Sequence, residues 1–169
     1  MKFLSEHLGS LRELYINQLR HMYSGETQIT DALPKMIEAA AAPELKSALE
    51  THLQETRGQS ARLEQILSRT DSGVKSMKNK GIDALIAEGE DVIKDADNVS
   101  VRDAAIIAAA QKIEHYEIAA YGTLRRYAEI LNETQDASLL QQTLREEKHA
   151  DEILTNIADS ANRAADRAA

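Results

Sequence analysis

The 169-residue sequence has no cysteine and no tryptophan, and it has only one phenylalanine, two prolines and seven glycines. Without cysteine, disulfides, thiolate zinc sites, iron–sulfur ligation and cysteine nucleophiles are excluded. No apolar run reaches the ~18–20 residues of a membrane-spanning helix, and the first seven residues lack the apolar core of a signal peptide. We therefore expect a cytoplasmic protein that does not associate with membranes.

The composition favours helices and argues against nucleic-acid binding. Good helix formers such as Ala, Leu, Glu and Gln dominate, while Pro and Gly are scarce. The formal net charge is −8, and the few aromatic residues offer no platform for stacking bases. We expect an all-α fold with no nucleic-acid partner.

Apolar residues recur at helical spacing along most of the chain. This periodicity predicts long helices at residues 5–41, 44–69, 100–131 and 137–161, and a short amphipathic helix at residues 82–94. Pro34 is expected to kink or divide the first helix, and Ser100, with Asp103 three residues later, is expected to cap the third long helix.

These elements predict one domain over residues 1–162, followed by a frayed tail at residues 163–169. Short turns join the helices into two hairpins, and a connection of roughly 25–30 residues that contains the short helix joins the hairpins. A four-helix bundle with one long crossover has the ferritin-like arrangement.

Carboxylates interrupt the apolar stripes of two predicted helices. Glu26 lies within the stripe of the first helix, and Glu114 and Glu117 lie three residues apart within the stripe of the third. A buried carboxylate without a partner is costly, so each must be protonated, pair with a base or bind a cation. The alternative is that these glutamates lie at an edge of the bundle, in contact with solvent.

The other two long helices carry histidine as well as glutamate. Glu146 and His149 have the Glu-x-x-His spacing with which one helix can offer a carboxylate and an imidazole to a dimetal centre; a surface position for His149 is equally compatible. Glu55 lacks this partner because Gly58 occupies the fourth position. His52, one turn earlier, could replace the missing imidazole or be an ordinary structural histidine.

The glutamates of each predicted hairpin are nearly equidistant from its turn. Glu26 and Glu55 flank the turn near residue 42, and Glu114 and Glu146 flank the turn near residue 132. At ~1.5 Å per residue, the offsets amount to about one helical turn or less. Each of the four long helices therefore places a carboxylate at the middle of the bundle.

Residues 52–59, 101–105, 109–119 and 121–124 form four specific sequence runs. These runs resemble the YciF-like family of bacterial stress-associated proteins. The resemblance covers nearly the whole chain and implies a ferritin-like helical homodimer.

More distantly, residues 146–151 are similar to the Glu-Glu-x-His-x-Asp run of bacterioferritin and rubrerythrin. This likeness implies a metal-ligand set of Glu26, Glu55, Glu114, Glu146 and His149, with Glu117 as an additional carboxylate. Gly58 departs from the pattern and leaves one metal with fewer protein ligands.

The leading hypothesis is therefore a site for two iron or two manganese ions per chain, open to O2 or peroxide. Tyr116 and Tyr121 could relay an electron there, although an ordinary core role is the commoner one. The alternative is a structural or interaction dimer whose buried glutamates are protonated or paired. A third reading, iron storage in a large shell, has no sequence determinant that we recognise.

Overall fold

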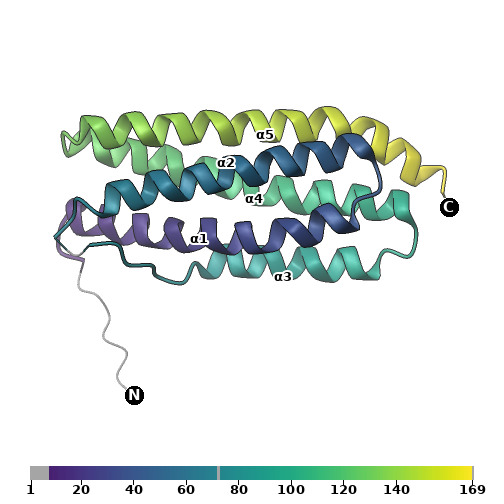
Figure 1. The fold of residues 1–169 in the computed structure, drawn as a ribbon, viewed down its shortest axis with the longest axis horizontal. Coiled ribbons are helices and arrows are strands. Elements are labelled where there is room, and N and C mark those ends of the chain that lie inside the picture. Colours follow the sequence, from purple (N-terminus) through teal and green to yellow (C-terminus); the bar gives the residue numbers. More distant parts are fainter. Residues whose placement is uncertain (1–7, 72, 169) are drawn as a thin grey trace, which may run out of the picture.

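A computed structural model of the chain describes residues 8–71 and 73–168, and over these residues the fold is entirely helical (Figure 1). The helices are α1 (Leu11–Ala39), α2 (Pro43–Leu67), α3 (Lys80–Asp95), α4 (Val99–Ile130) and α5 (Thr134–Asp166). The predicted all-α fold is confirmed. In the described part of the chain, no helix is both long enough and apolar enough to span a membrane.

The four long helices form two antiparallel hairpins that pack side by side. α1 packs along α2, and α4 packs along α5 (Figure 1). The long connection between the hairpins contains α3, which lies on the outside of the bundle against α4 and α1. This is the predicted ferritin-like arrangement with one crossover.

The apolar core of the bundle consists of two separate clusters. The cluster at the α1–α2 turn includes Ile29, Leu33, Leu49, Ile106, Ile113 and Leu154. The cluster at the α4–α5 turn includes Leu19, Met22, Leu63, Tyr121, Leu124 and Leu140. Along each long helix, buried polar side chains occupy the positions between the two clusters. The bundle is therefore apolar at both ends and polar at its centre.

Buried aspartates fasten the two ends of the bundle. At one end, Asp103 of α4 accepts hydrogen bonds from the backbone N–H groups of Ala41 (2.7 Å) and Ala42 (2.8 Å) in the α1–α2 turn. At the other, Asp136 of α5 accepts from the Tyr15 hydroxyl (3.0 Å) and pairs with Arg69. These contacts fix the longitudinal position of one hairpin against the other.

The first predicted helix differs from α1 at its start and at Pro34. α1 begins at Leu11, because the Ser10 side chain caps it by accepting from the backbone N–H of Glu13 (3.2 Å). The helix was predicted to start at residue 5, but residues 5–7 lie outside the described part of the chain. α1 also runs through Pro34 without being divided. Pro34 is exposed, so solvent can satisfy the carbonyl group that its missing N–H leaves free.

Two other predicted boundaries were wrong. Asn98, not Ser100, caps α4: its side chain accepts from the backbone N–H of Ser100 (2.8 Å). Asp103, which we expected to complete the Ser100 cap, instead binds the α1–α2 turn. α5 continues to Asp166, so residues 163–166 are helical rather than part of a frayed tail.

Candidate metal centre

Five ionisable side chains from four helices meet in the polar layer between the two apolar clusters. They are Glu26 of α1, His52 of α2, Glu114 and Glu117 of α4, and Glu147 of α5. All five are buried, and Glu26, Glu117 and Glu147 are 0 % exposed. We refer to these five residues as the carboxylate cluster.

The geometry of the cluster suits a cation. His52, Glu114, Glu117 and Glu147 each offer a ligand atom, and these atoms all lie within 4.8 Å of one another. His52 Nε2 lies 3.2 Å from Glu114 Oε1, although neither ring nitrogen is aligned for a hydrogen bond. Carboxylate oxygen and imidazole nitrogen together are a donor set that suits iron, manganese or zinc.

Glu26 adjoins this group from α1. Its Oε1 accepts a hydrogen bond from the hydroxyl of Tyr121, which is itself fully buried. Its Oε2 has no hydrogen-bond partner among the described residues. The hydroxyl therefore orients Glu26 and leaves one oxygen free on the carboxylate.

Most oxygens of the cluster lack a donor. Both oxygens of Glu117, both of Glu147 and Oε2 of Glu114 are buried without a hydrogen-bond partner in the described part of the chain. Carboxylates only accept hydrogen bonds, so two of them can bond to each other only when one carries a proton. Burying such groups without compensation costs several kcal/mol. Their number and closeness fit a bound cation.

The pKa values of the glutamates are all displaced in the same direction. Burial raises the pKa of Glu26 to about 7 and that of Glu147 to about 8. Burial, followed by the charges of neighbouring glutamates, raises the pKa of Glu117 well above its ordinary value. Burial also raises that of Glu114, although His52 opposes the shift. Without a cation, the cluster therefore retains protons near neutral pH.

The pKa of His52 has opposing influences. Burial lowers it, but the carboxylates of Glu114, Glu55 and Glu146 raise it, and the net pKa lies above the ordinary value. A metal ion would have to displace any proton on the ligating nitrogen, as it would on the glutamates. Cation binding at this cluster is thus coupled to proton release.

The structure brings together four of the seven predicted ligands: Glu26, His52, Glu114 and Glu117. Glu55 lies at the edge, with its Oε2 3.9 Å from His52 Nδ1 and its side chain 29 % exposed. It can hold the imidazole in place, but it does not belong to the group of close ligand atoms.

The structure does not bring Glu146 or His149 into the cluster. Glu146 forms an ion pair with Arg62 and also accepts from the side-chain amides of Gln59 (3.3 Å) and Gln142 (3.1 Å). His149 is exposed. The carboxylate that α5 contributes is Glu147, which the sequence prediction missed.

A signal for Glu147 was present in the sequence. The buried stripe of α5 has alternating steps of three and four residues at Leu140, Leu144 and Glu147, and it resumes at Leu154 and Ile157. The Glu-x-x-His motif instead favoured the neighbouring residue, Glu146. Residues 146 and 147 are about 100° apart around a helix, so only one can face the core.

Comparison with known proteins places the chain in a family. The model of a domain of unknown function, DUF892, matches residues 10–166. The chain belongs to the DUF892 family. The resemblance to YciF-like proteins is thereby confirmed as well, because Protein YciF of Escherichia coli (strain K12) is 43% identical over 153 residues, which cover 90% of this chain and 92% of YciF.

Solved structures of similar proteins have the same fold as this DUF892 chain. The crystal structure of the E. coli stress protein YciF matches with a TM-score of 0.87 and 42% identity, covering 92% of this chain and 98% of that one. YcfI from Rhodopseudomonas palustris, proposed to be a structural protein, also matches with a TM-score of 0.87, at 40% identity, covering 90% of this chain and 98% of its own.

Proposed function

We propose that this DUF892 protein binds two iron or two manganese ions in the carboxylate cluster. The observation that carries the proposal is the set of buried, unpartnered carboxylate oxygens beside His52, at the level between the two apolar clusters of the described residues. Among the described residues, no lysine or arginine donates a hydrogen bond to the oxygens of Glu117 or Glu147, which leaves a cation as their best partner.

The charge of the cluster supports two divalent ions rather than one. Glu26, Glu114, Glu117 and Glu147 carry four negative charges when ionised, which balance two divalent cations. Hard carboxylate ligands suit iron and manganese, and the imidazole of His52 suits iron as well. Two ions held there would supply redox chemistry towards O2 or peroxide.

Residues around the cluster have positioning roles in this proposal. The Tyr121 hydroxyl holds Glu26, and Glu55 lies close enough to His52 to orient its ring. Arg62, paired with Glu146, keeps that carboxylate at the edge of the bundle. The ligands thus come from the protein interior, and the charged residues at the edge support them.

A role in stress fits this chemistry, because E. coli YciF is described as a stress protein. We extend the proposal to a cytoplasmic homodimer. With no cysteine in the chain, electrons for repeated reduction of the metals would come from a separate donor. Sedimentation analysis tests the dimer: a mass of two chains supports it, and a mass of one chain refutes it.

Anaerobic titration of metal-free protein with Fe(II) and Mn(II) tests the metal site. We expect about two equivalents to bind per chain and protons to be released as they bind. Glu117→Gln removes a charge without changing the shape of the side chain and should abolish binding of at least one equivalent. Glu152→Gln, at an exposed position of α5, should bind as the wild type does. Absence of binding by the wild type would refute the proposal.

The second candidate function is a structural or interaction role, which the proposed role of R. palustris YcfI favours. In that case the buried glutamates would share protons instead of binding metal, in line with their raised pKa values. Metal analysis of freshly purified protein separates the two: stoichiometric iron or manganese supports the metal site, and a metal-free, fully folded protein supports the structural role.

A further inference from the structure

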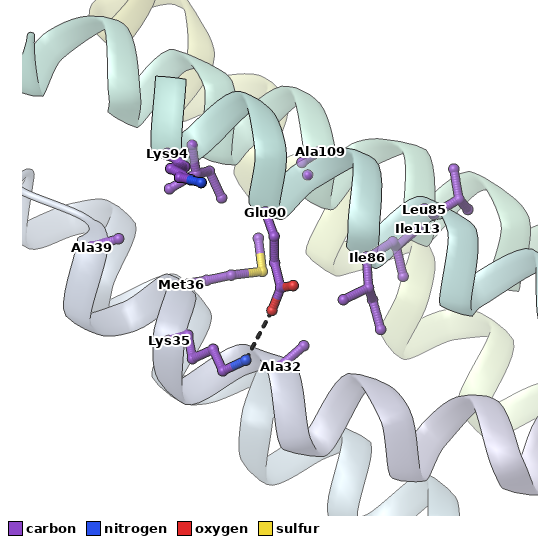
Figure 2. A pocket seen from close by; sticks show the side chains of 12 residues that line it. Ala32, Lys35, Met36, Ala39, Leu85, Ile86, Glu90, Lys94, Ala109 and Ile113 are labelled. Carbon is purple, nitrogen blue, oxygen red and sulfur yellow. Dashed lines mark hydrogen bonds and ion pairs between the residues drawn. The ribbon is translucent and has the colours of Figure 1, made fainter. Parts of the chain in front are cut away.

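A crevice of about 350 Å³ opens between α1, α3 and α4 (Figure 2). Its walls are mainly apolar, with Met36 on α1, Ile86 and Ile93 on α3 and Ile113 on α4. Small residues keep it open, since Ala32, Ala39 and Ala109 also line it. Gly89 lets α3 approach α4 closely here, because a Cβ atom on Gly89 would lie 3.0 Å from that of Ala109.

The rim of the crevice carries a few polar groups. Lys35 Nζ on α1 pairs with Glu90 Oε1 on α3 at 2.9 Å, a contact drawn in Figure 2. Lys94, in the last turn of α3, lines the crevice but has no ion pair or hydrogen bond among the described residues. A lysine ammonium group has three donors and no acceptor. A polar group placed beside Lys94 would therefore have to be an acceptor.

One layer of side chains separates the crevice from the carboxylate cluster. Ala32, Met36 and Ile113 line the crevice and also line a void of about 10 Å³, whose other lining residues include His52 and Glu114. Met36 is the flexible member of this layer, because methionine has an unbranched side chain with three rotatable bonds. The inner wall of the crevice thus borders the cluster.

We propose that the crevice binds a medium-chain aliphatic molecule with an oxygen-bearing end group. The chain lies against the apolar wall, and the terminal oxygen accepts a hydrogen bond from Lys94. The size is appropriate: an apolar cavity of about 150 Å³ holds benzene, so 350 Å³ accommodates roughly a dozen heavy atoms. The molecule would be a substrate of the carboxylate cluster, and this role rests on the proposed metal site. Its binding to the crevice does not depend on that site.

The probes for this site are octanoate and 1-octanol, added to metal-free, full-length protein labelled at the methionine methyl groups. Met36 lines the crevice, whereas Met22 lies in the other apolar cluster and serves as an internal control. We expect saturable shifts of the Met36 methyl resonance and none at Met22. From hexanoate to decanoate, the affinity should rise by up to about fourfold per methylene until the crevice is full.

Three variants assign the binding to the crevice. Ala39→Phe fills it and should abolish binding; Ala39→Leu, a milder change, should weaken it. Lys94→Gln should weaken octanoate binding about threefold and 1-octanol binding less, because exposed charges interact weakly. Lys75→Gln, at an exposed position in the connection between α2 and α3, should change neither. Circular dichroism checks that each variant is folded.

The proposal is overturned if Met36 does not respond to any of the probes, or if Met22 shifts as much as Met36. It is also overturned if no probe binds and sedimentation shows a dimer that Ala39→Phe separates into single chains. In that case a second chain covers the crevice. The probes are added to metal-free protein, so the two proposals can fail separately. A chain that binds octanoate but neither Fe(II) nor Mn(II) would refute the proposed metal function and support the crevice site.

Discussion

Glu146 and Glu147 are adjacent in α5 but lie in opposite environments. Glu147 is fully buried in the carboxylate cluster, and Glu146 pairs with Arg62 at the edge. Glu147→Gln should weaken Mn(II) binding about 100-fold or more, because losing a buried charged partner costs roughly 3 kcal/mol. Glu146→Gln should change it by less than about threefold. Calorimetric titration of both variants measures the difference, and the reverse order of effects would assign the ligand role to Glu146.

Tyr121 affects metal binding through Glu26. Its hydrogen bond lowers the pKa of Glu26, opposing the larger effect of burial. Tyr121→Phe should raise that pKa further, so that protons compete better with the metal. We expect roughly tenfold weaker Mn(II) binding at pH 7 and partial recovery at pH 8.5. An equal loss at both pH values would mean that the hydroxyl acts by packing and not through the protonation of Glu26.

At the residue scale, periodicity was a better guide to the site than motif. Glu26, Glu114 and Glu117 were predicted because they interrupt apolar stripes, and the structure places them in the cluster. His52 lies on the buried stripe of α2 in the same way. Glu147 was missed because a Glu-x-x-His spacing was given more weight than the stripe of α5. A motif specifies distance along the helix, whereas burial depends on the angle around it.

At the scale of helices and turns, Asp103 fastens α4 to the α1–α2 turn through two backbone N–H groups. Asp103→Ala leaves these donors without their acceptor and should lower the free energy of unfolding by about 2–3 kcal/mol. For a chain of this length, the melting temperature should fall by about 5–10 °C. Asp97→Ala, at an exposed position before α4, is the control. Equal melting temperatures of the two variants would show that the Asp103 contact does not stabilise the bundle.

The same contact explains why element boundaries were predicted less well than the elements themselves. The helices follow from a periodic pattern spread over many residues. Their ends depend on single side chains, and several candidates were available: Ser100 resembled a cap, but Asn98 fills that role. The partner of Asp103 lies about 60 residues earlier in the chain. Such a pairing depends on tertiary structure, which local sequence signals do not encode.

At the scale of the whole molecule, the bundle and the level of its polar layer were predictable because both depend on helix length and turn position. Antiparallel helices joined by short turns place residues equidistant from the turn at the same height. The crevice beside α3 was not predictable, since it arises from how closely an outer helix approaches two others. That distance depends on local contacts such as the one between Gly89 and Ala109.

The cluster should make the stability of the whole molecule depend on pH, with opposite signs in the metal-free and metal-bound states. In the folded chain, burial raises the pKa of Glu26 from 4.5 to about 7 and that of Glu147 to about 8. Groups with raised folded-state pKa values favour folding while protonated. Their contribution is complete below pH 4.5 and is lost as the pH rises through 7 to 8. The raised pKa of His52 acts in the same direction.

Metal-free protein should therefore be less stable at pH 8 than at pH 5.5. The shift of Glu26 alone corresponds to roughly 3 kcal/mol once the group is ionised. Bound Mn(II) should reverse the trend, because the metal requires deprotonated ligands and stabilises the folded state that binds it. Urea unfolding between pH 5.5 and 8, with chelator or with excess Mn(II), measures both curves.

Glu147→Gln should flatten the pH dependence of the metal-free protein's stability, since one of its titrating groups is gone. The assignment is that these buried carboxyl groups take up protons when no cation is bound. It would be contradicted if the free energy of unfolding of the metal-free protein rose between pH 5.5 and 8.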